Sequence, residues 1–303
     1  MERAGAFQRL AVVLLAVLPL AGACFAVVRL WSHGVGWLDL LLSLGWYLAS
    51  GFGVTIGFHR LLTHRSFRAR RWLKVSLTIA GSMAFEGSAI SWVAQHRRHH
   101  VHSDRPGDPH SPLTYARPGV IGRARGLWYA HLGWLLRKNR VDAQRWCPDL
   151  LADPDIVLVS ALTPLWAAAS LVLPFGMGWA FSGSLFGGFL ALVWAGLVRV
   201  LVLHHVTWSI NSICHAFGRR PFRTPDESRN VPVLALLSLG ESWHNAHHAF
   251  PALARHGVDA GQVDLSAALI ALFERLHWAS EVRWPTRELL VRRRNADAGG
   301  PMS

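Results

Sequence analysis

Four long apolar stretches constrain the fold of this chain more than any other feature of its sequence. A helix needs about 20 predominantly apolar residues to cross the hydrocarbon core of a bilayer. The four stretches lie at about 8–31, 36–57, 155–175 and 182–203. Hydrophobic residues make up 51% of the chain, which is above the share usual for a soluble enzyme. The sequence therefore predicts an all-α integral membrane protein with four transmembrane helices.

The first apolar stretch has a basic flank, and a cleaved secretory signal peptide is the alternative interpretation of it. Its apolar run exceeds a usual signal core, and no clear cleavage signal follows. We therefore expect a retained membrane anchor at 8–31.

A fifth apolar segment, Leu73 to Val93, is interrupted by Gly81, Glu86, Gly87 and several serines. If it crossed the bilayer, histidine-rich motifs on either side of it would face opposite compartments. We expect instead an in-plane or re-entrant helix, which keeps these motifs on one side.

The distribution of charge predicts the orientation. The loops at about 32–35 and 176–181 contain no Lys or Arg, whereas residues 59–154 and the C-terminal third are rich in arginine. By the positive-inside rule, both termini and the histidine motifs face the cytoplasm. The rule explains the net charge of +13 better than nucleic-acid binding does, because the arginines flank the apolar segments.

The architecture that follows is one membrane domain over residues 1–290. Its four-helix stem carries a helical cytosolic cap, formed by residues from about 58–154 and 204–290, that encloses a metal site. Residues 291–303 are expected to form a basic, disordered tail.

Eight histidines fall into three compact boxes. The boxes are His59 and His64; His96, His99 and His100; and His244, His247 and His248. The second and third repeat the pattern His-x-x-His-His. Residues four apart share one face of a helix, so the first and last histidine of each repeat can point at one centre. Neutral imidazole is a preferred ligand of transition metals, and the boxes predict a metal site.

Eight imidazoles exceed what a single ion takes from a protein while keeping an open position, so the sequence predicts two metals. A dimetal centre beside a bilayer suits either hydrolysis of a polar substrate or oxygen chemistry on an apolar one. Hydrolytic centres usually contain carboxylate ligands, and the boxes offer none. Attack on an unactivated C–H bond with dioxygen favours iron.

The boxes resemble those of the membrane acyl-CoA (stearoyl-type, delta-9) fatty acid desaturases. The similarity rests on His59-Arg60-Leu61-Leu62-Thr63-His64, on His96-Arg97-Arg98-His99-His100 leading into Asp108-Pro109-His110, and on Glu241-Ser242-Trp243-His244-Asn245-Ala246-His247-His248. It extends to Trp208-Ser209-Ile210-Asn211-Ser212-Ile213-Cys214-His215 and to His131-Leu132-Gly133-Trp134-Leu135-Leu136, and it covers about Gly51 to Pro251.

The resemblance implies that His215 is a ninth metal ligand and that Asn211 approaches a metal through water. It implies removal of two hydrogens from adjacent methylenes of a long saturated acyl chain, usually at carbons nine and ten, with O2 reduced to water by a diiron centre. No fused haem or flavin motif is present in the sequence, so a separate electron donor is expected. It would be a ferredoxin-type protein or a b-type cytochrome with its reductase.

The expected substrate contacts are Trp92 and Trp208, which would line the acyl tunnel, and Arg137 and Lys138, which would bind the carrier. The pattern departs from the animal desaturases here. Glu86 and Ala94 stand where a glutamine and an arginine are expected, and the Arg137-Lys138 pair is displaced by one position. Acyl-CoA is the expected substrate, with acyl carrier protein and phospholipid esters as alternatives.

Several other polar residues have two interpretations. His204 and His205 are interfacial or support a ligand, and His102, His110 and His131 hydrogen-bond loops or contact metal. His33, His256 and His277 are expected at the surface or interface. Asp104, Asp108 and Glu241 either hold ligand imidazoles in one tautomer or are solvated or capping carboxylates.

Two other functions remain open. A histidine-box hydroxylase of the alkane, sterol or carotenoid type would share the metals and the topology. A membrane metal carrier would need polar ligands inside its spanning helices, whereas these stretches have apolar interiors.

Overall fold

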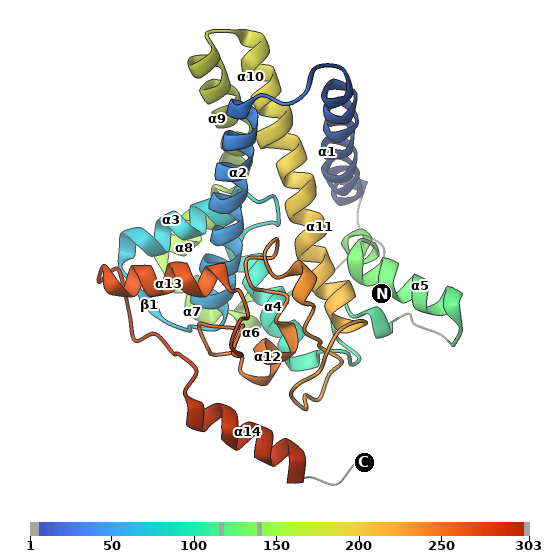
Figure 1. The fold of residues 1–303 in the computed structure, drawn as a ribbon, viewed down its shortest axis with the longest axis vertical. Coiled ribbons are helices and arrows are strands. Elements are labelled where there is room, and N and C mark those ends of the chain that lie inside the picture. Colours follow the sequence, from blue (N-terminus) through green and yellow to red (C-terminus); the bar gives the residue numbers. More distant parts are fainter. Residues whose placement is uncertain (1–5, 115–117, 138–140, 300–303) are drawn as a thin grey trace. The chain divides into compact units, whose positions relative to one another are not determined.

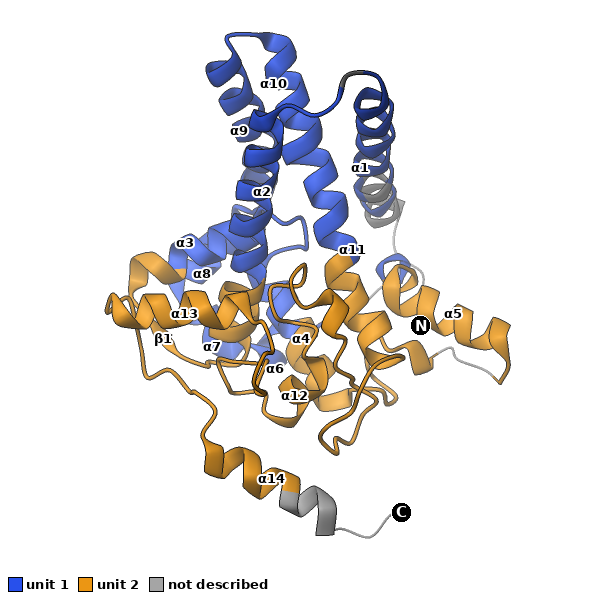
Figure 2. Cartoon of the chain, in the orientation of Figure 1, with its two compact units in different colours: residues 1–54, 75–94, 135–205 blue, residues 55–74, 95–134, 206–303 orange. Residues whose placement is uncertain are grey.

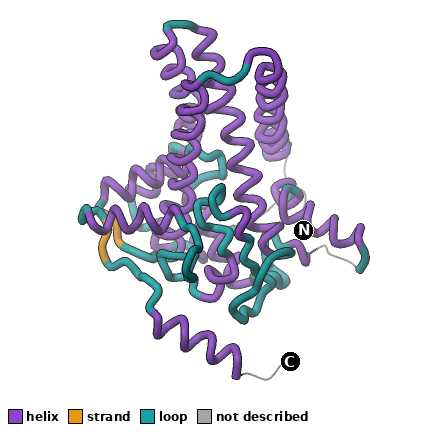
Figure 3. Tube along the Cα trace, viewed as in Figure 1, coloured by secondary structure: helices purple, strands orange, loops and turns teal. Residues whose placement is uncertain are grey.

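The computed structural model of the chain describes residues 6–114, 118–137 and 141–299. Helices make up nearly all of its regular structure (Figures 1 and 3). The two strands, β1 (Arg68–Ala69) and β2 (Ala279–Ser280), pair antiparallel, with Arg68 opposite Ser280. The all-α prediction is confirmed.

The helices of the first half, in chain order, are α1 (Ala6–His33), α2 (Trp37–Phe52), the π-helix η1 (Gly53–Thr63), α3 (Arg71–Ser82), α4 (Ala89–His102), the 3-10 helix η2 (Pro112–Thr114), α5 (Val120–His131) and the 3-10 helix η3 (Gly133–Leu136). Those that follow are α6 (Ala143–Trp146), α7 (Pro148–Leu151), α8 (Pro154–Ala161), α9 (Thr163–Ser182), α10 (Leu185–Ala191), the π-helix η4 (Leu192–Val198), α11 (Arg199–Ser212), the 3-10 helices η5 (Ile213–His215) and η6 (Pro232–Leu234), α12 (His244–Ala249), α13 (Leu265–Arg275) and α14 (Arg287–Gly299).

Among the described residues, three helices are long and apolar enough to cross a membrane: Trp37–Thr63, Thr163–Ser182 and Leu185–His215. They correspond to the second, third and fourth predicted stretches. In α1 the described apolar part, Val17–Ser32, is shorter than a full span. The four-span count and the cap therefore stay predictions.

The third and fourth predicted stretches have different limits in the structure. The stretch at 155–175 is divided by Leu162 into α8 and α9, because Pro164 lies in the first turn of α9 and favours a new helix start there. The last long helix extends past the predicted end at residue 203 and reaches His215. The polar residues that follow residue 203 continue its helical backbone.

The described chain forms two compact units, coloured separately in Figure 2. Unit 1 contains residues 1–54, 75–94 and 135–205, and unit 2 contains residues 55–74, 95–134 and 206–303. Both are assembled from three segments that alternate along the sequence.

In unit 1 the apolar helices pack through small residues. Leu42 of α2 packs against Ala191 and Ala195, which are fully buried. A Cβ atom added at Gly178 of α9 would lie 2.3 Å from the Cβ of Ala191. A side chain at this glycine would therefore separate α9 from the last long helix, since helix backbones in membranes approach closely through small residues.

The fifth apolar segment does not form a single helix. It divides into α3 and α4, which are separated by a turn containing Phe85 at φ 62° and Gly87 at φ 92°. Arg199 of α11 donates to the carbonyl of Met83 at 3.1 Å, and the imidazole of His204 lies 2.8 Å from the carbonyl of Ala84. Irregular backbone is tolerated at membrane depth where protein groups satisfy it. The break fits the expected in-plane or re-entrant segment.

Arg199 is 2% exposed and has a further structural role in unit 1. Its guanidinium donates to the hydroxyl of Ser170 in α9 at 2.6 Å and to that of Ser50 in α2 at 3.4 Å. One buried cation thus links two apolar helices to the turn after α3. His204 is 2% exposed, so its side chain is buried in the protein.

Unit 2 contains all three histidine boxes, on η1 and its end, on α4 and on α12. Its C-terminal helix α14 covers residues 291–299, where the sequence analysis expected a disordered tail. The hydroxyl of Thr286 accepts a hydrogen bond from the backbone of Leu289 at 3.2 Å and caps this helix. The good helix formers that follow, such as Glu288, Leu290 and Arg292, explain the difference.

Candidate metal centre

The nine predicted histidine ligands gather into two clusters within unit 2. In each cluster the candidate ligand atoms lie within 4.8 Å of one another. The five-histidine cluster consists of His59, His64, His96, His100 and His247. The four-histidine cluster consists of His99, His215, His244 and His248.

The spacing of the first box is explained by a π-helix. His59 and His64 are five residues apart, which would place them on different faces of an α-helix. In η1 the backbone N–H of His64 donates to the carbonyl of His59 at 3.1 Å, a bond of the i→i+5 type. The two rings therefore lie on one face, with centroids 4.8 Å apart.

The other two boxes each divide between the clusters. His96 and His100, the first and last histidines of the box on α4, belong to the five-histidine cluster, whereas His99 belongs to the four-histidine cluster. On α12 the first and last histidines belong to the four-histidine cluster, and His247 belongs to the other. The first and last residues of each repeat share a helix face, as the spacing predicts.

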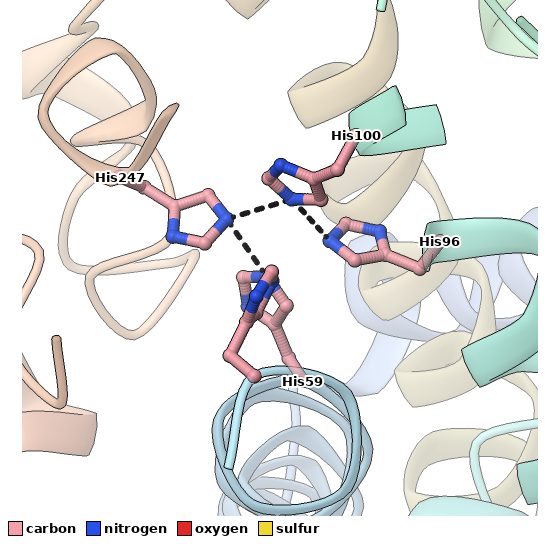
Figure 4. Close-up of side chains that lie close together, drawn as sticks. His59, His96, His100 and His247 are labelled. Atoms are coloured by element: carbon pink, nitrogen blue, oxygen red, sulfur yellow. Dashed lines mark hydrogen bonds between the residues drawn. The ribbon is translucent and has the colours of Figure 1, made fainter. Parts of the chain in front are cut away.

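The ring nitrogens converge at distances that suit a metal ion. In Figure 4 the rings of His59, His96, His100 and His247 point toward one another, His96 and His100 from α4 and the other two from η1 and α12. The Nε2 atom of His247 lies 3.1 Å from that of His59 and 3.0 Å from that of His100. Two nitrogens at right angles around one ion, each about 2.1 Å from it, lie about 3.0 Å apart. The five-histidine cluster fits this spacing.

The second cluster shows the same convergence. The Nε2 atoms of His215 and His244 lie 3.0 Å apart. The buried Nε2 atoms of His248 and, in the first cluster, His64 have no hydrogen-bond partner among the described residues. A metal ion in each cluster would accept the free lone pair of one of these two nitrogen atoms. Each cluster therefore fits one ion.

Five of the clustered imidazoles are held in the neutral form that binds metals, whereas the carboxylate of Asp108 raises the pKa of His99 despite its burial. Burial and the neighbouring histidines keep the pKa of His64, His96 and His100 well below the usual value. The same causes lower the pKa values of His244 and His247. Because a ligand histidine must be deprotonated, little proton release is needed on metal binding.

Four carboxylates hold the outer nitrogens of the clusters. The Nδ1 atoms of His99, His215 and His248 lie 3.0, 2.8 and 2.7 Å from carboxylate oxygens of Asp108, Asp104 and Asp226, respectively. The Nδ1 atom of His59 contacts Glu241. Such contacts fix the tautomer and direct Nε2 at the metal.

These contacts also decide the ionisation of the carboxyl groups. Burial alone would raise the pKa values of Asp108 and Asp226, but the histidines beside them hold both well below the usual range. The structure places Asp104, Asp108 and Glu241 in the supporting positions considered for them. Asp226 was not foreseen, because nothing in its local sequence indicates a contact with His248.

Arg60 is a further residue that the sequence did not reveal as part of the centre. It is 0% exposed and lies 3.0 Å from both Glu241 and Asp264. It also donates to the carbonyl of Ala254 at 2.7 Å. Arg60 therefore fixes the carboxylate that contacts His59.

His256 was expected at the surface or interface, and this expectation is wrong. The residue is 1% exposed, and its ring lies 4.3 Å from that of His247, because residues after the third box fold back onto η1. Its Nδ1 atom lies 3.3 Å from Nη2 of Arg60, which can only donate. His256 also forms a third group with His59 and Glu241, whose candidate ligand atoms lie within 4.8 Å of one another.

The remaining histidines separate into buried and exposed groups. His110 is buried beside His99, with ring centroids 4.5 Å apart, and burial lowers its pKa to about 3. His131, the last residue of α5, lies 3.0 Å from the hydroxyl of Ser212, the last residue of α11. His277 is exposed, as expected.

The proposed substrate contacts are less well defined than the clusters. Trp92 donates from Nε1 to Glu86 at 2.8 Å within unit 1, and Trp208 packs against His131 in unit 2. Arg137 is the last residue before a gap in the described chain, and Lys138 lies outside the described residues. Asn211 lies in the last turn of α11, four residues before His215. The roles assigned to these residues stay predictions.

Comparisons with known proteins agree with this centre. The family model described as fatty acid desaturase matches residues 35–269. The chain is 38% identical over 275 residues to a hex-5-enoyl-[acyl-carrier protein] acetylenase of Moorena producens (strain JHB), covering 90% of this chain and 86% of that protein.

Two further relatives carry desaturase names. An sn-1 stearoyl-lipid 9-desaturase of Anabaena variabilis is 36% identical, over 86% of this chain and 89% of its own length. Delta-9 acyl-lipid desaturase 1 of Arabidopsis thaliana is 37% identical, over 82% of this chain and 77% of its own length.

Proposed function

Because the chain belongs to the fatty acid desaturase family, we propose that it introduces a cis double bond into a long saturated fatty acyl chain, between carbons nine and ten. The observation that carries the proposal is the division of nine buried or partly buried histidines into clusters of five and four. Two of the named relatives support the position of the double bond, since their names give it as nine.

The proposed reaction consumes one O2, two electrons and two protons for each double bond. Two hydrogens leave adjacent methylenes, and the four hydrogens in total appear in two molecules of water. Two iron ions, one in each cluster, supply the reduction of O2 and the oxidising power for C–H cleavage when bound. The nine imidazoles would hold these ions, with Asn211 approaching one of them through water.

The chain's own residues orient and protect the centre. Glu241, Asp104, Asp108 and Asp226 hold the ligand rings in position, which preserves the geometry needed for a selective reaction. Trp92 and Trp208 are proposed to line the acyl tunnel. Arg137 and Lys138 are proposed to contact the anionic carrier.

The carrier of the acyl chain has two candidates. A thioester, with acyl-CoA as the first choice, is the substrate that the sequence motifs favour. A lipid-linked acyl chain is the second candidate, because two of the relatives named above are lipid desaturases. The name of the Moorena relative specifies acyl carrier protein, so that thioester belongs in the same test.

We further propose a multi-pass topology in which four helices cross the bilayer and both termini and the metal centre face the cytoplasm. The three apolar helices and the arginine-free loops support it. Electrons would come from a separate ferredoxin-type or b-type cytochrome donor with its reductase.

Expression in a desaturase-deficient, iron-replete host tests the function directly. Gas chromatography of total fatty acids should reveal a new monounsaturated acid. The product should disappear in His247→Ala and persist in His277→Ala, a control at an exposed position. A hydroxylated acid would instead favour a histidine-box hydroxylase, and unchanged lipids would refute both activities. Supplying labelled acyl-CoA, acyl carrier protein and phospholipid to membranes identifies the carrier.

A further inference from the structure

One loop of unit 2 joins exposed arginines to the four-histidine cluster. The loop, residues 216–229, follows η5 and is called the arginine loop here. Its side chains at Arg219, Arg220 and Arg223 are exposed, whereas Phe222 and Asp226 are buried. The loop therefore presents cations on its outer side and polar or aromatic groups on its inner side.

Other arginines extend this positive surface. Arg105 donates to the carbonyl of Pro225 at 3.4 Å, and Arg293 of α14 donates to the carbonyl of Arg223 at 2.5 Å. The guanidinium of Arg294 lies 5.5 Å from the centre of the Phe222 ring. Carboxylates offset part of the charge, since Glu227 pairs with Arg220 at 3.0 Å and with Arg229 at 2.9 Å, and Asp259 pairs with Arg294. The surface remains strongly basic.

The inner side of the loop holds two ligands of the four-histidine cluster. Asp226 accepts from Nδ1 of His248 at 2.7 Å. The backbone N–H of Glu227 donates to Asp104 at 2.7 Å, and Asp104 in turn accepts from Nδ1 of His215 at 2.8 Å. A single carboxylate group therefore connects each of these two ligands to the backbone of the arginine loop.

The loop is also firmly positioned. The side chain of Asn245 in α12 accepts from the N–H of Phe222 at 2.9 Å and donates to its carbonyl at 3.0 Å. The backbone of Arg219 pairs with that of Asn230 in both directions. A surface held in this way needs little ordering when a partner binds.

The carboxylate that supports the five-histidine cluster has different neighbours. Glu241, which contacts His59, is held by the fully buried Arg60, and Arg60 pairs with the buried Asp264. This chain of contacts leads into the interior of unit 2, not to exposed cations.

We propose that the arginine loop is the docking surface for an acidic one-electron carrier protein, and that electrons enter at the four-histidine cluster. The inference rests on the proposed function, which needs two electrons per double bond. Two reduced carriers, each oxidised by one electron, supply them in succession. Complementary charge accelerates such encounters and makes them sensitive to salt.

The test uses the purified, iron-loaded enzyme and two acidic carriers: a [2Fe–2S] ferredoxin and the soluble haem domain of a b-type cytochrome. Photoreduced free flavin serves as a reductant that needs no docking surface. The variant R219E/R223E should raise the KM for a carrier by about tenfold or more at low salt and weaken the salt dependence. Its rate with free flavin and its iron content should match those of the unaltered enzyme.

Two charge-matched controls locate the effect. R275E/R287E changes the same number of charges on α13 and α14 and should leave the carrier KM unchanged. R65E/R68E alters exposed arginines next to His64 of the five-histidine cluster. An effect confined to this second pair would move electron entry to the other cluster and overturn the inference.

The milder R219Q/R223Q removes charge without reversing it and should give a smaller rise in KM. An unchanged KM in this variant at low salt contradicts the inference, as does turnover with free flavin but with neither acidic carrier. If no reductant yields a double bond, the proposed function itself fails, and the two failures are thus distinguishable.

Discussion

The Nδ1 atom of His248 lies 2.7 Å from a carboxylate oxygen of Asp226, on a loop that the histidine motifs do not include. The contact fixes which ring nitrogen of His248 carries the proton. It leaves Nε2, which has no hydrogen-bond partner among the described residues, available to a metal ion.

Replacing this carboxylate should weaken metal binding without unfolding the protein. Asp226→Asn keeps the shape but removes the negative charge, and we expect a loss of about 10- to 100-fold in iron affinity or activity. Iron titration with a competing chelator measures the change. Glu281→Gln, at an exposed carboxylate paired with Arg68, is the control. Equal affinities in both variants would contradict the supporting role of Asp226.

The two clusters should lose iron separately. His64→Ala removes a ligand of the five-histidine cluster and His244→Ala one of the four-histidine cluster. Each variant should lower the iron content from about two to about one per chain, and the double variant should approach zero, because each cluster binds its own ion. Elemental analysis of purified protein measures this, with His277→Ala as the control. A loss of both ions in each single variant would instead mean that the two clusters bind metal as one unit.

Removing Arg60 should destabilise the protein strongly. Arg60→Met leaves Glu241 and Asp264 buried without their cation, and breaking such a pair typically costs about 3–5 kcal/mol. We expect a lower thermal unfolding midpoint in detergent, and iron loss that begins at the five-histidine cluster.

Arg60→Lys is the informative comparison for this prediction. It keeps the charge but cannot form the same forked contacts, so an intermediate midpoint is expected. A midpoint equal to that of the unaltered protein in Arg60→Met would show that the ion-pair network does not stabilise the fold.

The proposed topology can be tested by labelling single cysteines in a background where Cys24, Cys147 and Cys214 are replaced. Arg65→Cys and Arg105→Cys should react with an impermeant maleimide only after the cells are opened. Ser184→Cys, between α9 and α10, should react in intact cells. All three positions are exposed, so a lack of labelling cannot be attributed to burial. Reaction of Arg65→Cys and Arg105→Cys under different conditions would show that the segment between them crosses the bilayer.

The sequence predicted the arrangement of the second and third boxes because helix geometry is regular. Residues four apart share a face, and His96 with His100 and His244 with His248 do so. The first box required a π-helix, for which the residues Gly53–Thr63 give no clear signal. Its convergence could be inferred from the resemblance but not from helical periodicity.

The supporting contacts were harder to predict because they join distant segments. Arg60 and Glu241 are separated by 181 residues, and only the complete fold brings them together. The burial of His256 was hard to predict for the same reason, because it depends on the path of the chain after α12. Hydropathy located the apolar segments well but missed the division at Leu162, where Pro164 begins a new helix.

Because α4 and α12 each supply histidines to both clusters, neither half of the centre has a scaffold of its own. Rotating or shifting either helix would displace nitrogen atoms in both halves together. Insertions or deletions within these two helices should therefore be tolerated far less than changes in the surrounding loops, and the two halves must change in concert as the protein evolves.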